Sequence, residues 1–135
     1  MPQSSIAEAH ILVIDEDAQA RGVLVDELQG LGAAHVRETG DPLEALEIMR
    51  SGAADLLVTE RYLHLVRFIR ANNHPEIAAL PIVAVSAHHR DADIHEAIDA
   101  GVDEFVPKPV EPVALLEGLM RALSRARISS ARGPI

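Results

Sequence analysis

Residues 11–17 read ILVIDED, a run of four apolar residues that passes directly into three acids. A short apolar run, three of whose members are β-branched, predicts a strand buried on both faces. Such strands are typical of parallel sheets, in which ligands bind at the carboxyl ends of the strands. We therefore expect Asp15, Glu16 and Asp17 at that edge, where a cation, a lysine or water must offset their mutual repulsion.

Composition limits the class of protein. The 135 residues suit one domain, and an apolar content of 48% with only 2% aromatic residues predicts an aliphatic core. Cysteine is absent, which excludes disulfides, thiol catalysis and cysteine-based metal sites. A formal net charge of −9 argues against nucleic acid as the main partner. Since neither a signal peptide nor a membrane span is recognisable, we expect a cytoplasmic protein without a membrane partner.

The rest of the chain alternates helical and extended patterns. Strands are predicted at 11–14, 33–37, 55–60, 82–85 and 105–106, and helices at 18–29, 42–51, 61–71, 92–100 and 113–123. Asp17 is expected to cap the first helix and Asp41 the second, where Pro42 takes the first helical position. Helical spacing predicts the following apolar faces: Leu24, Val25 and Leu28; Leu43, Leu46 and Met49; Tyr62, Leu65, Val66 and Ile69; Ile94, Ala97 and Ile98; Leu115, Leu116, Leu119 and Leu123.

Five strands that alternate with five helices predict an α/β fold of right-handed βαβ units. We expect a doubly wound, five-stranded parallel sheet, (βα)5, with helices on both faces. An N-terminal extension at 1–9 precedes this domain at 10–124, and residues 125–135 are expected to form a C-terminal tail without helical pattern.

Four of the predicted strands end in a chemically useful group: Asp15 with Glu16, Glu60, Ser86 and Lys108. The carboxyl ends of parallel strands meet at one edge of a sheet, so these groups should converge. Carboxylate oxygens from separate strands suit Mg²⁺, and a hydroxyl beside an ammonium suits a phosphoryl group held against that ion. Lys108 is the only lysine in the chain, which makes its place in this set notable.

At these residues the chain resembles the receiver domain of two-component response regulators, over nearly its whole length. The matching positions are the acidic pair Asp15 and Glu16 after the first strand, Ser86 and Ala87 after the fourth, and Phe105, Lys108 and Pro109 at the fifth. The resemblance implies a CheY-like, flavodoxin-like fold and a signalling role. It also implies a Mg²⁺ site, a phosphate pocket and switch at the last five of these residues, and a cis Lys108–Pro109 bond.

The third strand departs from the receiver pattern. Glu60 stands where the family carries its phosphorylatable aspartate, and the loop that normally follows is shortened because helical residues begin at once. A glutamate carboxylate lies about 1.5 Å further from the backbone, and in-line transfer tolerates little misplacement. We therefore expect no normal aspartyl phosphorylation. Asp55 cannot substitute, because five strand residues place it roughly 16 Å away.

Two arrangements of the altered pocket remain open. In one, Glu60 reaches toward Lys108 and imitates the charge of a phosphorylated family member. In the other, the pocket is collapsed and holds no metal. A Mg²⁺ site made by Asp15, Glu16 and Glu60 also stays open and could be vacant, because Asp15 and Glu16 alone would form a weak site.

The expected function is therefore protein binding rather than catalysis. The resemblance implies a histidine kinase, a phosphotransfer protein or another signalling protein as partner. The surface that receivers usually present is formed by the helix at 92–100, the last strand and the last helix, which here includes Ile94, Ile98 and Phe105. Monomer and homodimer both stay open.

Competing interpretations involve the same residues. A haloacid-dehalogenase-like phosphatase would use Asp15 as nucleophile and Asp17 as general acid, but the acidic pair that such enzymes need after the lysine is missing. A flavin-binding module would need a phosphate-cradling loop after the first strand, which is also missing.

Ser86 could cap the next helix instead of acting as a switch. His88, His89 and His95 lack the i, i+4 spacing of helical metal ligands and predict a polar surface.

Overall fold

The computed structural model describes residues 5–60 and 63–132. Five strands are formed: β1 (His10–Ile14), β2 (His35–Thr39), β3 (Leu56–Glu60), β4 (Ile82–Ser86) and β5 (Glu104–Pro107). They alternate with helices α1 (Ala18–Gly30), α2 (Pro42–Arg50), α3 (Leu63–Arg70), α4 (Pro75–Ala78), α5 (Asp91–Ala100) and α6 (Pro112–Arg132). The predicted alternation of strands and helices is thus confirmed.

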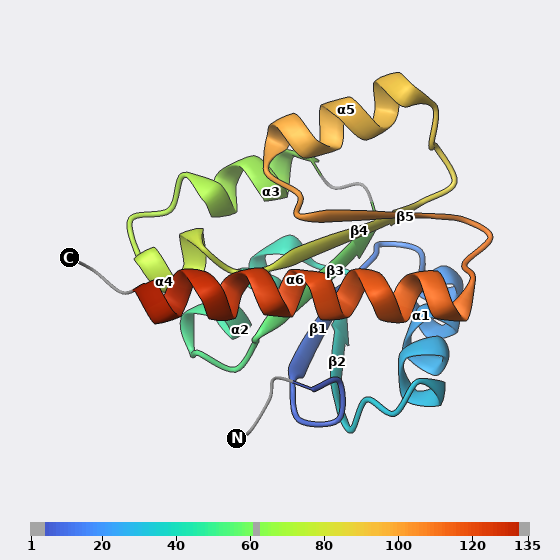
Figure 1. Ribbon diagram of the computed structural model, residues 1–135, viewed down its shortest axis with the longest axis horizontal. Helices are drawn as coiled ribbons and strands as arrows, with labels where there is room; N and C mark the ends of the chain where they lie inside the picture. The colour runs from blue at the N-terminus through green and yellow to red at the C-terminus, as the bar shows by residue number, and fades with distance from the viewer. Residues whose placement is uncertain (1–4, 61–62, 133–135) are drawn as a thin grey trace.

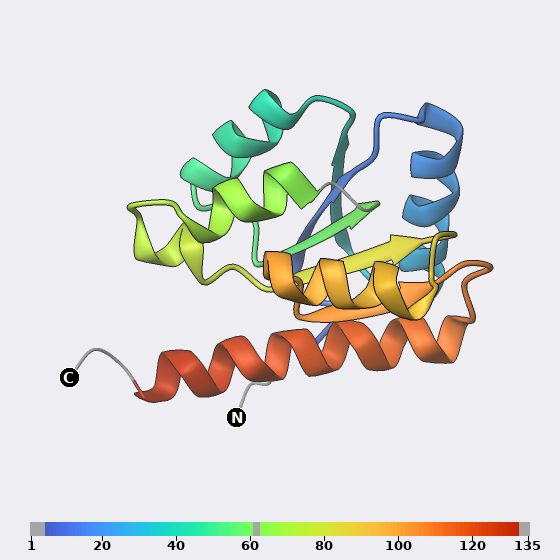
Figure 2. The same cartoon turned by 90° about the horizontal axis from the view of Figure 1, so that it is seen from above.

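The strands form one parallel sheet in the order β2-β1-β3-β4-β5. Helices cover both of its faces, as the two orthogonal views show (Figures 1 and 2). This arrangement confirms the doubly wound (βα)5 fold expected from the sequence. The order also makes β2 and β5 the two edge strands and places β1, β3 and β4 inside, so three strand ends of the predicted site lie at the centre.

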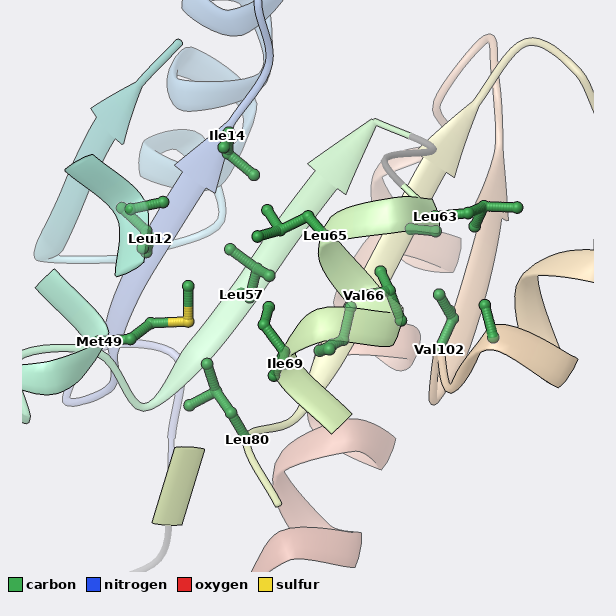
Figure 3. Packing of buried hydrophobic residues seen from close by; sticks show 14 of the residues in the cluster. Leu12, Ile14, Met49, Leu57, Leu63, Leu65, Val66, Ile69, Leu80 and Val102 are labelled. Carbon is green, nitrogen blue, oxygen red and sulfur yellow. The ribbon is translucent and has the colours of Figure 1, made fainter. Parts of the chain in front are cut away.

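The sheet separates two aliphatic clusters. One lies between the sheet and helices α2, α3 and α5, where Leu12, Leu57 and Ile69 are fully buried (Figure 3). The other lies on the opposite face, where α1 and α6 contribute Leu28 and Leu119. Both clusters consist of Leu, Ile, Val, Ala and one Met, as the low aromatic content predicted. The interior strands are buried on both faces because each supplies alternate side chains to the two clusters.

Several sequence predictions were wrong at the ends of elements. The last helix does not end at Leu123 but continues to Arg132, so the expected loss of helix beyond residue 124 is not seen. The second strand begins at His35 rather than at residue 33, because Ala33 still donates its backbone N–H to the carbonyl of Leu28. The four-residue helix α4 was missed, since one turn is too short to show a periodic pattern.

Two apolar residues lie on the wrong side of their predicted helices. Leu43 is 71% exposed because α2 turns Ala45, Ile48 and Met49 inward instead. On α5, Ile98 is 46% exposed, whereas the preceding residue, Ala97, is buried. The remaining predicted faces are confirmed for α1, α3 and α6, apart from Tyr62, which lies outside the described residues.

Side-chain caps fix where the first two helices begin. Asp41 precedes Pro42 and accepts a hydrogen bond from the backbone N–H of Leu43 at 3.0 Å, as predicted. We expect Asp41→Ala to lower the free energy of unfolding by about 1 kcal/mol, the usual value of an N-cap. Asp41→Asn keeps an acceptor oxygen and should cost much less. Urea unfolding of both variants measures this difference, and equal losses would contradict the cap as its cause.

Candidate functional site

The ends of the central strands lie level with one another. Ile14 pairs with Thr59, so Asp15, the next residue along β1, stands level with Glu60 at the end of β3. Ser86 ends β4 opposite Pro107, directly before Lys108. The predicted site residues are therefore gathered at the carboxyl edge of one sheet.

The pleat of the sheet divides these residues between two sides. Asp15, Glu60 and Lys108 each follow by two residues a buried valine of the α1–α6 cluster, namely Val13, Val58 and Val106. Successive side chains of a strand alternate between faces, so Glu60 belongs to the α1–α6 side. Asp15 and Lys108 lie one residue beyond the ends of β1 and β5, and the same alternation, continued by one residue, assigns them to that side. Ser86 follows Ala84 and belongs to the α2–α3–α5 side, against which Phe105 also packs. The acids and the lysine therefore share one side, while the hydroxyl and the aromatic ring share the other.

Hydrogen bonds give the three acids of residues 15–17 different roles. Asp15 is only 5% exposed, and its Oδ1 accepts the backbone N–H of Asp17 at 2.9 Å. Asp17 is exposed and caps α1, since its Oδ1 accepts from the N–H groups of Gln19 and Ala20. The prediction of Asp17 as an N-cap is confirmed. Within the part of the chain that the structure describes, no hydrogen bond is formed by Asp15 Oδ2.

Arg21 is a site residue that the sequence did not reveal. Its Nη1 donates to the backbone carbonyl of Asp15 at 2.7 Å, and its Nε donates to Glu38 at 3.0 Å. Glu38 lies on β2, a strand whose neighbours follow from the sheet order and not from spacing along the chain. No local pattern could therefore have paired Glu38 with Arg21.

Glu60 and Lys108 are not in contact. Both are partly exposed, and among the described residues no hydrogen bond or ion pair joins the two side chains. The positive charge of Lys108 acts instead on a carboxyl group of α1. Burial raises the pKa of the Glu27 carboxyl, and the positive charge of Lys108 opposes this rise. The arrangement in which Glu60 reaches Lys108 is thus not the one present here.

Ser86 does not cap the following helix. Its hydroxyl is 1% exposed and accepts the backbone N–H of His88 at 3.0 Å, whereas Arg90 occupies the N-cap position of α5. Its carbonyl accepts the N–H of Lys108 at 2.9 Å, which ties the ends of β4 and β5 together. The next residue, Ala87, is exposed. Lys108–Pro109 is a cis peptide bond, as the resemblance implied.

The carboxylates offer a partial fit to a divalent cation. No group of three or more His, Asp or Glu residues in the described ranges is arranged to hold a metal ion, which applies to Asp15, Glu16 and Glu60 together. A smaller donor set does fit, because the buried carboxylate of Asp15 keeps one oxygen free of hydrogen bonds to the described residues and Glu16 follows it. Mg²⁺ typically binds one or two carboxylates and completes its shell with water.

Comparison with known proteins decides the family. The chain matches the response regulator receiver domain family over residues 11–120. It is a receiver domain. Receivers are the response components of two-component signalling, and the assignment gives no support to a haloacid-dehalogenase-like phosphatase.

Individual relatives agree with this assignment. The chain is 30% identical to the chemotaxis protein CheY-3 of Vibrio cholerae over 121 residues, which is 85% of this chain and 92% of that protein. It is 31% identical to the chemotaxis protein CheY of Pseudomonas aeruginosa, with 85% and 96% covered. Each match covers more than nine tenths of the relative.

Solved structures show the same fold. NtrX from Brucella abortus superposes with a TM-score of 0.77 and 26% identity, over 91% of this chain and 28% of that one. The receiver domain of a sensor histidine kinase from Pseudomonas aeruginosa superposes with a TM-score of 0.73 and 21% identity, over 86% and 98%. That receiver was solved with a magnesium ion in its active-site cleft. Within the described residues of the present chain, no helix is long and apolar enough to cross a membrane.

Proposed function

We propose that this receiver acts by binding a signalling protein and is not switched by normal aspartyl phosphorylation. One observation carries the proposal: Glu60 ends β3 level with Asp15, where the receiver pattern expects an aspartate. The extra methylene moves the carboxylate outward by about 1.5 Å, a displacement that in-line phosphoryl transfer does not tolerate well.

The surroundings of Glu60 support the same proposal. Helix α3 begins at Leu63, only three residues along the chain, so little sequence is left for the loop that follows the acceptor in other receivers. Asp55 lies at the opposite edge of the sheet, where its Oδ2 accepts the backbone N–H of His10 at 2.8 Å. Asp55 therefore cannot serve as the acceptor at the carboxyl edge.

A divalent cation is part of the proposal, held by Asp15 and Glu16. When bound, Mg²⁺ would neutralise part of the negative charge of the two carboxylates and complete its shell with water. The Pseudomonas aeruginosa receiver, which has the same fold, was solved with a magnesium ion in its active-site cleft, and this supports a divalent cation as part of the proposal. We assign the chain no enzymatic turnover, and hydrolysis of p-nitrophenyl phosphate that is lost in Asp15→Asn would contradict that assignment.

The partner surface is proposed on α5, β5 and α6. Strand β5 is an edge strand, Ile98 on α5 is 46% exposed, and Phe105 on β5 is partly exposed. Beside them Arg121 of α6 binds Glu104 at 3.0 Å, so the surface combines apolar side chains with fixed charges. A kinase, a phosphotransfer protein or another cytoplasmic signalling protein would suit it, and we place the chain in the cytoplasm with its partner.

Incubation with acetyl phosphate and Mg²⁺ tests the proposal directly. We expect intact-mass spectrometry to show no phosphoryl adduct on the wild-type chain, while the Pseudomonas aeruginosa CheY, treated in parallel, serves as the positive control. An acid-labile, hydroxylamine-sensitive adduct, as expected of an acyl phosphate, that disappears in Glu60→Gln would contradict the proposal, because it would show that the glutamate accepts phosphate.

A further inference from the structure

The guanidinium group of Arg21 lies against the main chain of residues 15–17, which we call the acidic loop. Arg21 extends from α1, and its Nη1 donates to the carbonyl of Asp15 at 2.7 Å. Its Nε donates to Glu38 of β2 at 3.0 Å, and the Arg21 side chain is only 20% exposed. The side chain thus links the edge strand β2 to the peptide that joins Asp15 to Glu16.

The chain leaves room for this guanidinium at Gly40. A Cβ placed on Gly40 would lie 2.7 Å from Arg21 Nη1 and 3.4 Å from the Asp15 carbonyl oxygen. The first distance is too short for a carbon and a nitrogen in van der Waals contact, so any side chain at position 40 must push the guanidinium away. Two residues from β2 and its following turn, Glu38 and Gly40, therefore define where Arg21 sits.

Other hydrogen bonds also hold the acidic loop in place. Its amide side is well fixed, since Asp15 donates its N–H to the carbonyl of Thr39 at 3.2 Å and Asp17 donates to Asp15 Oδ1. The peptide plane between Asp15 and Glu16 carries both residues, so its orientation affects where their side chains start from the backbone. Arg21 is the side chain that binds the oxygen of that plane.

We propose that Arg21 is a positioning residue for a divalent-cation site at Asp15 and Glu16, and that Glu38 and Gly40 hold it there. The inference rests on the proposed cation site. Arg21 does not touch the ion in this scheme but acts through the Asp15 carbonyl, as hydrogen-bond partners of metal ligands commonly do.

Mn²⁺ titration of the full chain, followed by water proton relaxation, measures the effect. We expect Arg21→Gln and Gly40→Ala each to weaken Mn²⁺ binding by about tenfold, the lower end of the range for such partners. The double variant should be no weaker than either single variant, because both remove the same interaction. Arg37→Gln, which removes an exposed arginine from the same strand β2, is the matched control and should leave the affinity unchanged.

Amide hydrogen exchange supplies a readout that needs no metal. Exchange at the N–H of Asp17 should accelerate in Arg21→Gln and stay at the wild-type rate in Arg37→Gln. Gly40→Ala keeps every polar group and displaces only the end of the Arg21 side chain. If Arg21→Gln does not fold, the Gly40→Ala variant tests the same interaction.

The outcomes separate the two proposals. Wild-type Mn²⁺ binding that is unaltered in the Arg21 and Gly40 variants, or losses that add in the double variant, would overturn the positioning role alone. A wild-type chain that binds no Mn²⁺ at millimolar concentration would overturn the cation site and this inference with it.

Discussion

Arg70→Met is expected to lower the free energy of unfolding by about 3 kcal/mol, because it leaves several partly buried polar groups without a partner. Arg70 donates to three backbone carbonyls, those of Ala78, Leu80 and Gly101, at 2.6–2.9 Å. Its Nη2 donates to Asp103 at 2.8 Å, with the two side chains 23% and 27% exposed. Urea unfolding followed by circular dichroism at 222 nm measures the loss.

Arg67→Met on the same helix is the matched control. Arg67 is exposed, so its removal should change the free energy of unfolding by less than about 0.5 kcal/mol. A loss for Arg70→Met as small as that of the control would show that water replaces the four hydrogen bonds without penalty.

Gly101→Ala is expected to cost about 3 kcal/mol, from two causes that act together. Gly101 ends α5 with φ at 122°, a conformation that residues with a side chain rarely adopt. A Cβ at this position would also lie 2.5 Å from Arg70 Cγ, so it would displace the side chain that binds the Gly101 carbonyl. The same urea experiment measures the loss.

A double-mutant cycle separates the two causes. In an Arg70→Ala background the steric conflict is gone, and Gly101→Ala should then cost only the backbone part, about 1–2 kcal/mol. Gly30→Ala, at the end of α1 with no atom near its Cβ position and no positive φ, should be close to neutral. An equal loss from Gly101→Ala in both backgrounds would contradict the contact with Arg70.

The fold could be predicted from the sequence because its signals are local. Apolar runs such as Ile11–Ile14 and Ile82–Val85 are buried on both faces, and caps such as Asp17 and Asp41 mark where helices begin. The wrong assignments arise where the apolar pattern is too weak to mark the end of an element. Helix α6 keeps good helix formers such as Ala126 and Ala131 beyond Leu123, where the predicted apolar face ends, so the end of the apolar pattern was not the end of the helix.

The candidate site could be predicted only as far as the strand ends. Parallel pairing brings Asp15, Glu60 and Ser86 to one edge whatever the loops do. The contacts of Arg21 and Arg70 could not be predicted, because their partners Glu38 and Asp103 lie 17 and 33 residues further along the chain. The influence of the Lys108 charge on Glu27 could not be predicted either, since it depends on how α1 and the last strand are placed and not on spacing along the chain.

Because both clusters are aliphatic, the protein has only weak intrinsic fluorescence. The chain has no tryptophan, one tyrosine and two phenylalanines, so its interior offers no strong native chromophore. Phe105 lies partly exposed on the edge strand β5 and packs against the cluster on the α2–α3–α5 face. An indole introduced there would be the sole such emitter in the protein, and its spectrum would report on this one edge of the sheet without background from the core.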